Sequence, residues 1–263
     1  MAEFSHKVIW ITGASSGIGE ALAYEFARKG ASLVLSARRV SELERVKAGC
    51  PETAGKILVL PLDMTHIDTF GAVFQQVVEE MGQVDVLVNN AGFSQRGLTR
   101  ETAFEVDRKL MEVDFFGQIA LTKAILPHML ERKSGHFVVM SSLTGKFGYP
   151  HRSAYAAAKH ALQGFFETLY LEEMRNGISV TIANPGGIRT NISKNAMTAD
   201  GGTYGKMDPL QAEGMRPETC ARIIVNAVQK KKFEVVIGTP REKLAVWLKR
   251  LVPSVFHGVA KLK

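Results

Sequence analysis

The sequence predicts a doubly wound α/β fold built on one parallel sheet of about seven strands. Short apolar runs rich in Val, Ile and Leu alternate with longer segments that have the period of amphipathic helices. Strands that are apolar throughout are typical of a parallel sheet that helices cover on both faces. Because no repeat or linker divides residues 1–263, we expect a single domain.

Seven runs along the chain are predicted strands, and each is followed by turn or helix signals. They lie at 7–12, 32–37, 56–62, 84–89, 136–141, 178–183 and 233–238. The segment 186–216 is the longest one without a clear pattern. A loop of this length in a compact domain is usually functional, so we expect it to act as a substrate loop or lid.

Cysteine content and hydropathy argue against several classes of protein. Cys50 and Cys220 are the only cysteines and form no C-x-x-C pair, which argues against a disulfide framework or a zinc site and favours a reducing compartment. We expect no metal. No signal peptide and no apolar run long enough to span a membrane is apparent, so we expect a cytoplasmic protein.

The net charge of +7 is concentrated near the C-terminus. Residues 229–263 contain nine lysines and arginines and two glutamates, so the rest of the chain is balanced and no nucleic-acid partner is expected. Within this region, 240–263 is a basic amphipathic tail with an apolar stripe: Leu244, Trp247, Leu248 and Leu251. Two interpretations stay open, packing on the domain or another subunit and peripheral contact with a membrane surface.

A glycine-rich turn follows the first predicted strand. In "TGASSGIGEALA", Gly13, Gly17 and Gly19 stand between a strand and a helix. Glycines allow a tight turn and a close approach to a pyrophosphate, which the N-terminus of the next helix also attracts. The alternative is an ordinary turn between strand and helix, but the context on both sides favours a dinucleotide site.

The end of the second predicted strand bears on the choice of cofactor. NAD sites usually carry an Asp or Glu there, whereas this strand ends in Arg38 and Arg39, with no acid until Glu42. Guanidinium groups suit a phosphate dianion and can stack on adenine. We therefore expect NADP(H), although two solvated arginines at a helix start are the simpler alternative.

Tyr155 and Lys159 lie one helical turn apart in "SAYAAAKHA", with only alanines between them. A free tyrosine is almost wholly protonated at pH 7, and a neighbouring ammonium favours the phenolate that acid–base catalysis needs. Such pairs also occur on ordinary helices. Ser142, at the end of a predicted strand, supplies a hydroxyl for a reacting carbonyl oxygen and favours the catalytic interpretation.

Taken together, these motifs resemble the short-chain dehydrogenase/reductase family. The resemblance rests on "TGASSGIG", "NNAG" (89–92), Ser142 in "MSSLTG", "YAAAK" (155–159) and "NPGGIRT" (184–190), in that order. It implies a Rossmann fold with strand order 3-2-1-4-5-6-7 and hydride transfer between a nicotinamide and a carbonyl or alcohol. It also implies a homodimer or homotetramer.

The resemblance implies a role for each matching residue. Tyr155 would be the general acid/base, Lys159 its partner and a ligand of the nicotinamide ribose, and Ser142 the group that polarises the substrate. The implied cofactor-binding residues are Gly13, Ser15, Ser16, Gly17, Ile18, Gly19, Arg38, Arg39, Asp63, Met64, Asn90, Ala91, Gly92, Tyr155, Lys159, Pro185, Gly186, Ile188 and Thr190.

One residue departs from the family pattern. Asp114, in "MEVDFFG", stands where the family commonly carries an asparagine that holds a water near the lysine. An ionised Asp has no side-chain donor and could pair with Lys159, weakening its effect on Tyr155. We expect a working enzyme with a shifted pH optimum.

The leading hypothesis is an NADP(H)-dependent oxidoreductase that acts on a ketone or secondary alcohol. Phe93, Phe147, Tyr149 and Met197 are candidate walls of an apolar pocket, with His151 and Arg152 at its edge. The tail is similar to that of family members that act on steroids, retinoids and other lipids, which favours a lipophilic substrate. The alternatives are an NADP-using epimerase and a non-catalytic dinucleotide-sensing or scaffold protein.

Overall fold

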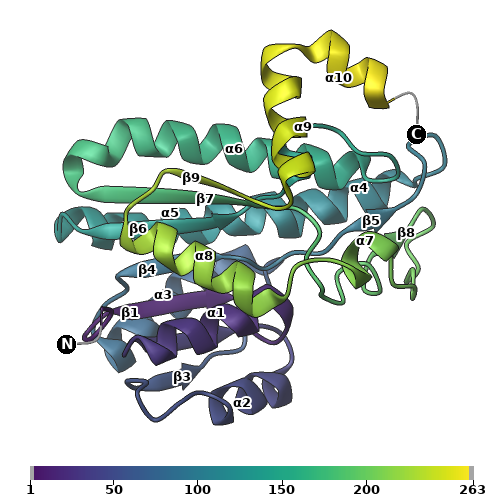
Figure 1. Ribbon diagram of the computed structural model, residues 1–263. Helices are drawn as coiled ribbons and strands as arrows, with labels where there is room; N and C mark the ends of the chain where they lie inside the picture. The colour runs from purple at the N-terminus through teal and green to yellow at the C-terminus, as the bar shows by residue number, and fades with distance from the viewer. Residues whose placement is uncertain (1–2, 261–263) are drawn as a thin grey trace.

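The computed structural model describes residues 3–260 and contains a seven-stranded parallel sheet between layers of helices (Figure 1). The predicted fold class and strand order are confirmed. The labels β5 and β8 are missing from this sheet because they belong to a separate two-stranded sheet. In spatial order the strands are β3 (Ile57–Val59), β2 (Ser32–Ser36), β1 (Val8–Thr12), β4 (Val86–Asn89), β6 (Gly135–Met140), β7 (Ile178–Pro185) and β9 (Glu234–Ile237).

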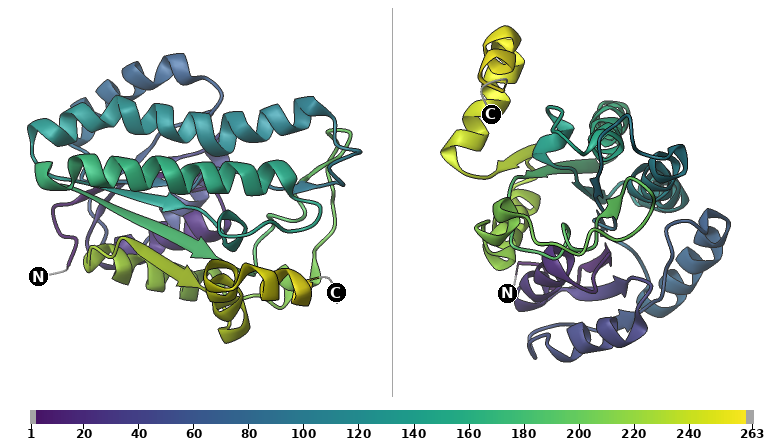
Figure 2. Two further views of the ribbon diagram at one scale, coloured as in Figure 1. Left: turned by 90° about the horizontal axis from the view of Figure 1, so that it is seen from above. Right: turned by 90° about the vertical axis from the view of Figure 1, so that its right-hand side faces the viewer.

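Amphipathic helices cover both faces of the sheet (Figure 2). One face packs against α1 (Gly17–Arg28), α2 (Val40–Ala48) and α8 (Pro217–Gln229), and the other against α3 (Phe70–Met81), α5 (Gly117–Glu131) and α6 (Ser153–Glu173). In α1, Leu22 and Phe26 are one turn apart and fully buried. The period read from the sequence therefore orients each helix on the sheet.

Shorter helices complete these layers. The 3-10 turn η1 (Ile67–Thr69) leads into α3, and η4 (Met174–Asn176) extends α6. Helix α4 (Phe104–Met111) packs against α6 near its N-terminal half and runs directly into the π-helix η2 (Glu112–Phe116). This continuous α4–η2–α5 segment brings residues of the α4–α5 junction close to the end of β4.

Parallel strands place their carboxyl ends along one edge of the sheet, where ligands of open α/β folds bind. At this edge the glycine turn follows β1, Arg38 follows β2, Asn90 follows β4, Ser142 follows β6 and Pro185 ends β7. Motifs that are far apart in the chain are thereby brought to one side of the molecule.

The structure differs from the sequence prediction at one strand and adds a small sheet. The run 56–62 forms only the three-residue β3, although Leu60 N still donates to Leu35 O at 3.0 Å and continues the pairing with β2. Two-residue strands β5 (Gln95–Arg96) and β8 (Met197–Thr198) pair in parallel. This pair ties the predicted loop 186–216, which also contains α7 (Pro209–Ala212), to the segment after β4.

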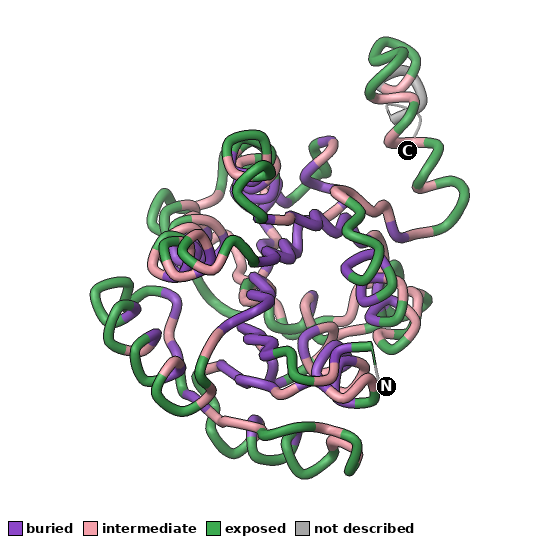
Figure 3. Tube along the Cα trace, turned by 90° about the vertical axis from the view of Figure 1, so that its left-hand side faces the viewer, coloured by how far each residue is buried: buried purple, intermediate pink, exposed green. Residues whose placement is uncertain are grey.

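The C-terminal tail forms two helices that project from the body (Figures 2 and 3). Helix α9 (Pro240–Leu251) begins with a capping box between Thr239 and Glu242, and the predicted break at Pro253 is the start of α10 (Pro253–Ala260). Within residues 3–260, no helix has the length and apolar character needed to cross a membrane. Residues 1–2 of the predicted domain and 261–263 of the tail lie outside the described residues.

Candidate active site

The glycine turn between β1 and α1 is held by the segment that follows β4. Gly13 and Gly17 have φ angles of +64° and +63°, which favour glycine. A Cβ on Gly13 would lie 2.9 Å from Ala91 Cα, so the turn packs directly on the neighbouring backbone. Asn90 Nδ2 donates to Thr12 O at 2.9 Å and to Gly13 O at 3.2 Å. The turn is therefore fixed from two strands.

This turn borders a cleft that fits a dinucleotide. Ser16, the N-cap of α1, makes no side-chain capping bond, which leaves the first-turn N–H groups without a side-chain partner at the end that attracts anions. The cleft has a volume of about 740 Å³. Its lining includes most of the residues expected to bind the cofactor: Gly13, Ser15, Ser16, Gly17, Ile18, Arg38, Arg39, Asp63, Met64, Asn90, Ala91, Gly92 and Thr190.

Gly19 is the predicted cofactor residue that lines neither the dinucleotide cleft nor the cavity that contains Tyr155. A Cβ there would overlap the Gly13 carbonyl oxygen and lie 2.6 Å from Asn90 Nδ2. Its function in the structure is therefore to let α1 pack closely on the turn. This agrees with the packing role of the last glycine in dinucleotide-binding turns.

The basic residues after β2 lie at the outer end of this cleft. Arg38 and Arg39 are exposed, and Arg39 Nη2 is 3.5 Å from Ser15 Oγ. Asp63 accepts hydrogen bonds from the backbone N–H and hydroxyl of Thr65, which lower the pKa of its carboxyl. The end of β2 therefore presents two cations and no carboxylate of its own.

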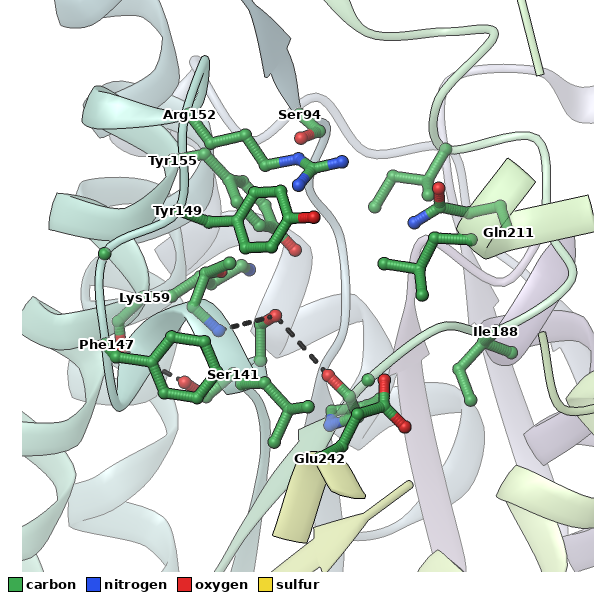
Figure 4. A pocket seen from close by; sticks show the side chains of 18 of the residues that line it. Ser94, Ser141, Phe147, Tyr149, Arg152, Tyr155, Lys159, Ile188, Gln211 and Glu242 are labelled. Carbon is green, nitrogen blue, oxygen red and sulfur yellow. Dashed lines mark hydrogen bonds between the residues drawn. The ribbon is translucent and has the colours of Figure 1, made fainter. Parts of the chain in front are cut away.

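A second cavity, of about 990 Å³, is lined by Ser142, Tyr155 and Lys159, and we refer to it as the catalytic cavity because these three residues are the ones expected to be catalytic. Figure 4 shows Tyr155 and Lys159 at this cavity. Tyr155 and Lys159 lie on the first turns of α6 and are only 8% and 3% exposed. Lys159 Nζ is 5.5 Å from the centre of the Tyr155 ring. Ser142 precedes the short 3-10 helix η3 (Leu143–Gly145), and its Oγ accepts from Thr144 N at 3.2 Å.

The two cavities are continuous. Both are lined by Ile18, Asn90, Gly92, Thr190 and Ile192, so the catalytic cavity opens directly onto the dinucleotide cleft. Of the remaining predicted residues, Pro185, Gly186 and Ile188 line the catalytic cavity. A molecule in the cleft can therefore extend one end towards Tyr155.

Asp114 forms a buried ion pair with Lys159. The π-helix η2 carries Asp114, whose side chain is fully buried. Its Oδ2 lies 3.1 Å from Lys159 Nζ, and its Oδ1 accepts from Phe93 N at 3.0 Å. Lys159 Nζ also donates to Met140 O at 3.1 Å. The expectation that Asp114 would lie near Lys159 is therefore met.

This pair sets the charge beside Tyr155. Burial by itself would lower the pKa of Lys159, but Asp114 and Tyr155 outweigh it and raise that pKa. For Asp114, burial raises the pKa, and Lys159 and the Phe93 N–H offset only part of the effect. Lys159 therefore remains an ammonium, with part of its charge cancelled by the carboxylate.

The C-terminal tail and the segment 186–216 supply much of the rest of the catalytic cavity. Leu244, Ala245 and Leu248 of α9 line it, and the rings of Phe147 and Phe256 lie 5.2 Å apart across its outer end. The predicted apolar stripe therefore has two parts: Leu244 and Leu248 line the cavity, whereas Trp247 and Leu251 do not and are 61% and 67% exposed. The sequence placed Leu244 and Leu248 in an amphipathic stripe and Phe147 among the candidate pocket walls, but it did not indicate that the tail would reach this cavity.

The aromatic and Met residues expected as pocket walls divide between the cavities. Phe147 and Tyr149 line the catalytic cavity, whereas Phe93 and Met197 line the dinucleotide cleft. Arg96 is a cavity residue that sequence reasoning missed. It lies on β5, which at two residues is too short to produce a periodic pattern.

Comparison with known proteins gives relatives along nearly the whole chain. The "Dehydrogenase/reductase SDR family protein 7-like" of Anopheles gambiae is 45% identical over 260 residues, covering 97% of this chain and 82% of that protein. The "Dehydrogenase/reductase SDR family member 7B" of Mus musculus is 43% identical over 262 residues, covering 98% and 81%.

Solved structures agree with these sequence relatives. A short-chain dehydrogenase from Streptomyces avermitilis superposes with a TM-score of 0.80 at 33% identity, covering 97% of this chain and 96% of that one. An alcohol dehydrogenase from Thermococcus sibiricus, complexed with 5-hydroxy-NADP, gives 0.77 at 27% identity, covering 89% and 97%. The short chain dehydrogenase family model matches residues 7–201. With that match and relatives above 40% identity, the chain belongs to the short-chain dehydrogenase/reductase family.

Proposed function

We propose that this protein is an NADP(H)-dependent oxidoreductase that interconverts a lipophilic ketone and its secondary alcohol, with Tyr155 as general acid/base. The observation that carries the proposal is the shared cavity of Tyr155, Ser142 and Lys159, which opens onto the glycine-lined dinucleotide cleft. The family membership supports oxidoreductase chemistry of this kind.

The chain's own groups can bind and polarise a carbonyl. The Tyr155 hydroxyl donates a proton to the carbonyl oxygen in reduction and accepts it back in oxidation. Ser142 Oγ donates to the same oxygen, where negative charge develops. Lys159 favours the phenolate that remains and offers N–H donors to a ribose. When bound, the nicotinamide supplies or accepts the hydride.

The preference for NADP(H) rests on the end of β2. Arg38 and Arg39 are exposed beside the cleft, and two charged guanidinium groups suit a 2′-phosphate. The Thermococcus sibiricus enzyme was solved with 5-hydroxy-NADP and a metagenomic short-chain oxidoreductase with NADP, which supports the same preference here.

A lipophilic substrate suits the walls of the catalytic cavity. The apolar residues that line it include Leu143, Phe147, Leu210, Leu244 and Leu248. Apolar walls with a few polar groups are typical of sites for small lipophilic molecules. A volume of about 990 Å³ has room for a substrate much larger than a short-chain ketone.

For the tail we propose peripheral contact with an anionic membrane surface. Trp247, Leu251 and Val255 are exposed on α9 and α10, and Lys243 and Arg250 flank them. Exposed apolar groups surrounded by cations are typical of helices that lie on such a surface. A homodimer or homotetramer that buries this face is the competing proposal, and light scattering with Trp247→Glu distinguishes the two.

Turnover with a matched active-site variant tests the proposed function. NADPH oxidation would be followed at 340 nm with a panel of ketosteroids, retinal, aromatic ketones and quinones. We expect turnover of at least one ketone and its loss in Tyr155→Phe, which keeps the ring and removes the proton donor. Turnover that survives in Tyr155→Phe would contradict the assigned mechanism.

A further inference from the structure

Two buried arginines that line the catalytic cavity share a single carboxylate. Arg96 of β5 donates to Asp208 Oδ2 from Nε at 2.8 Å and from Nη2 at 2.6 Å. Arg152, the residue before α6, donates to the same oxygen from Nη2 at 3.0 Å. The Arg96 and Arg152 side chains are 8% and 10% exposed, so two positive charges and one negative charge lie largely out of contact with water.

The two arginines differ in how fully they are paired. Arg96 Nη1 also donates to Ser94 Oγ at 2.8 Å and to Gln95 O at 2.6 Å, so its guanidinium is well satisfied. Arg152 stacks 4.5 Å over the Tyr149 ring, and its bond to Asp208 is its single side-chain hydrogen bond among residues 3–260. A guanidinium has five N–H donors, so most donors of Arg152 have no protein acceptor among the described residues.

These open donors face the proposed catalytic cavity. Figure 4 shows the Arg152 guanidinium reaching into the cavity between Ser94 and the Tyr149 ring, with Gln211 on the far side. Arg152 precedes Tyr155 by three residues, so a group bound to it lies close to the general acid/base. Burial and the like charge of Arg96 lower the pKa of Arg152, and Asp208 offsets only part of this effect.

Gln211 gives a second and independent indication of a polar ligand. It lines the same cavity from α7 and is 8% exposed. Its Oε1 is buried and has no hydrogen-bond partner among the described residues. A buried carbonyl oxygen without a donor is costly, and an O–H or N–H group on a ligand would satisfy it, whereas an oxyanion, which only accepts, would not.

We infer that Arg152 forms a subsite for an oxyanion, a carboxylate or phosphate monoester, on the substrate of this enzyme, and that Gln211 beside it accepts from a hydroxyl donor of the same substrate. The inference rests on the proposed function and narrows its substrate class to amphiphilic ketones. The anionic group binds Arg152, the ketone lies a few bonds away beside Tyr155, and the apolar part extends towards Leu244 and Leu248 of α9. An oxyanion would give the Arg152 guanidinium an anionic partner of its own and neutralise the positive charge that Asp208 leaves unbalanced.

Binding of matched amphiphiles tests the subsite without requiring turnover. Octanoate, octanamide and octyl phosphate would be titrated by calorimetry into the protein saturated with NADPH. We expect octanoate to bind about 10- to 100-fold more tightly than octanamide, because a hydrogen bond to a charged group is stronger than one to a neutral group. The stronger of octanoate and octyl phosphate identifies the type of oxyanion. Equal affinity for octanoate, octyl phosphate and octanamide would overturn the inference.

Variants of Arg152 and Gln211 test whether these residues cause the preference for octanoate over octanamide. Arg152→Gln should bring the octanoate-to-octanamide ratio close to one, whereas Arg100→Gln, which removes an exposed arginine of 77% side-chain exposure, should leave it unchanged. Gln211→Glu keeps the Arg152–Asp208 contact and adds a negative charge to the cavity, so it should also abolish the preference. A preference that persists in both Arg152→Gln and Gln211→Glu would refute the assignment.

Failure of this inference is distinguishable from failure of the proposed function. Turnover of neutral ketones that depends on Tyr155, with no binding preference for oxyanions, would preserve the oxidoreductase proposal and refute the subsite. An oxyanion preference that depends on Arg152, without ketone turnover in the panel, would establish the subsite and refute the proposed reaction for that panel.

Discussion

Replacing Asp114 with Asn should move the pH–rate profile of the enzyme towards acid. The substitution removes a negative charge 3.1 Å from Lys159 Nζ and leaves the shape of the side chain almost unchanged. Removing an anion lowers the pKa of every neighbouring group that it stabilises in the protonated form. The alkaline limb, assigned to Lys159, whose pKa Asp114 raises, should therefore move to lower pH.

The expected size follows from the distance between Asp114 Oδ2 and Lys159 Nζ. At 3.1 Å and an effective dielectric constant near 20, a full charge on Asp114 stabilises the ammonium by roughly 5 kcal/mol before desolvation is subtracted. Burial of both groups offsets part of this attraction, so we expect a displacement smaller than the full attraction would give, towards acid.

The assay is the pH dependence of kcat/KM for alcohol oxidation, with circular dichroism to confirm folding. Glu105→Gln is the matched control, because it removes an exposed carboxylate from α4, which runs into the π-helix that carries Asp114. Asn can still accept from Phe93 N through its amide oxygen. A folded variant whose profile is unchanged or displaced towards alkali would refute this account of Asp114.

Three further predictions concern stability, the cofactor and the tail. Burial, and then Lys231, lower the pKa of His136 from 6.5 to about 4, so the unfolded chain binds the extra proton between these values. The free energy of unfolding should fall by about 3 kcal/mol from pH 7 to 4, and urea titrations should show that His136→Gln lacks this slope. Replacing Arg38 and Arg39 together by Ala should raise KM for NADPH on the order of tenfold to a hundredfold and change KM for NADH much less; equal effects would contradict the phosphate-binding role. Trp247→Glu should weaken flotation with phosphatidylserine vesicles, whereas Leu171→Glu, at an equally exposed position on α6, should not, and equal flotation of both variants would argue against membrane contact.

Local patterns in the sequence were sufficient for the framework of the site. The positive φ angles at Gly13 and Gly17, the spacing of Tyr155 and Lys159 and the strand before Ser142 all follow from neighbours in the chain. The sequence also indicated that Asp114 would approach Lys159, through the family pattern. It did not indicate the π-helix that carries Asp114, because one extra residue in a helical turn leaves no periodic signal.

Strands and helices too short to show a repeating pattern could not be predicted from the sequence. The β5–β8 pair has two residues on each strand, and α7 has four, so neither presents the alternation or the helical spacing that identifies an element. The edge strand β3 was predicted too long, because an apolar run shows where a chain can be buried and not where its partner strand ends.

The sequence by itself determined the strands, the glycine turn and the Tyr155–Lys159 pair, because each depends on residues within one strand, turn or helix, whereas the order of the strands followed only from the family resemblance. Only the tertiary structure decided what surrounds them. Arg96 and Asp208 are 112 residues apart, Arg152 and Asp208 are 56 apart, and α9 reaches the cavity from the far end of the chain. Contacts of this range depend on how loops pack once the sheet has formed, and no local spacing encodes them.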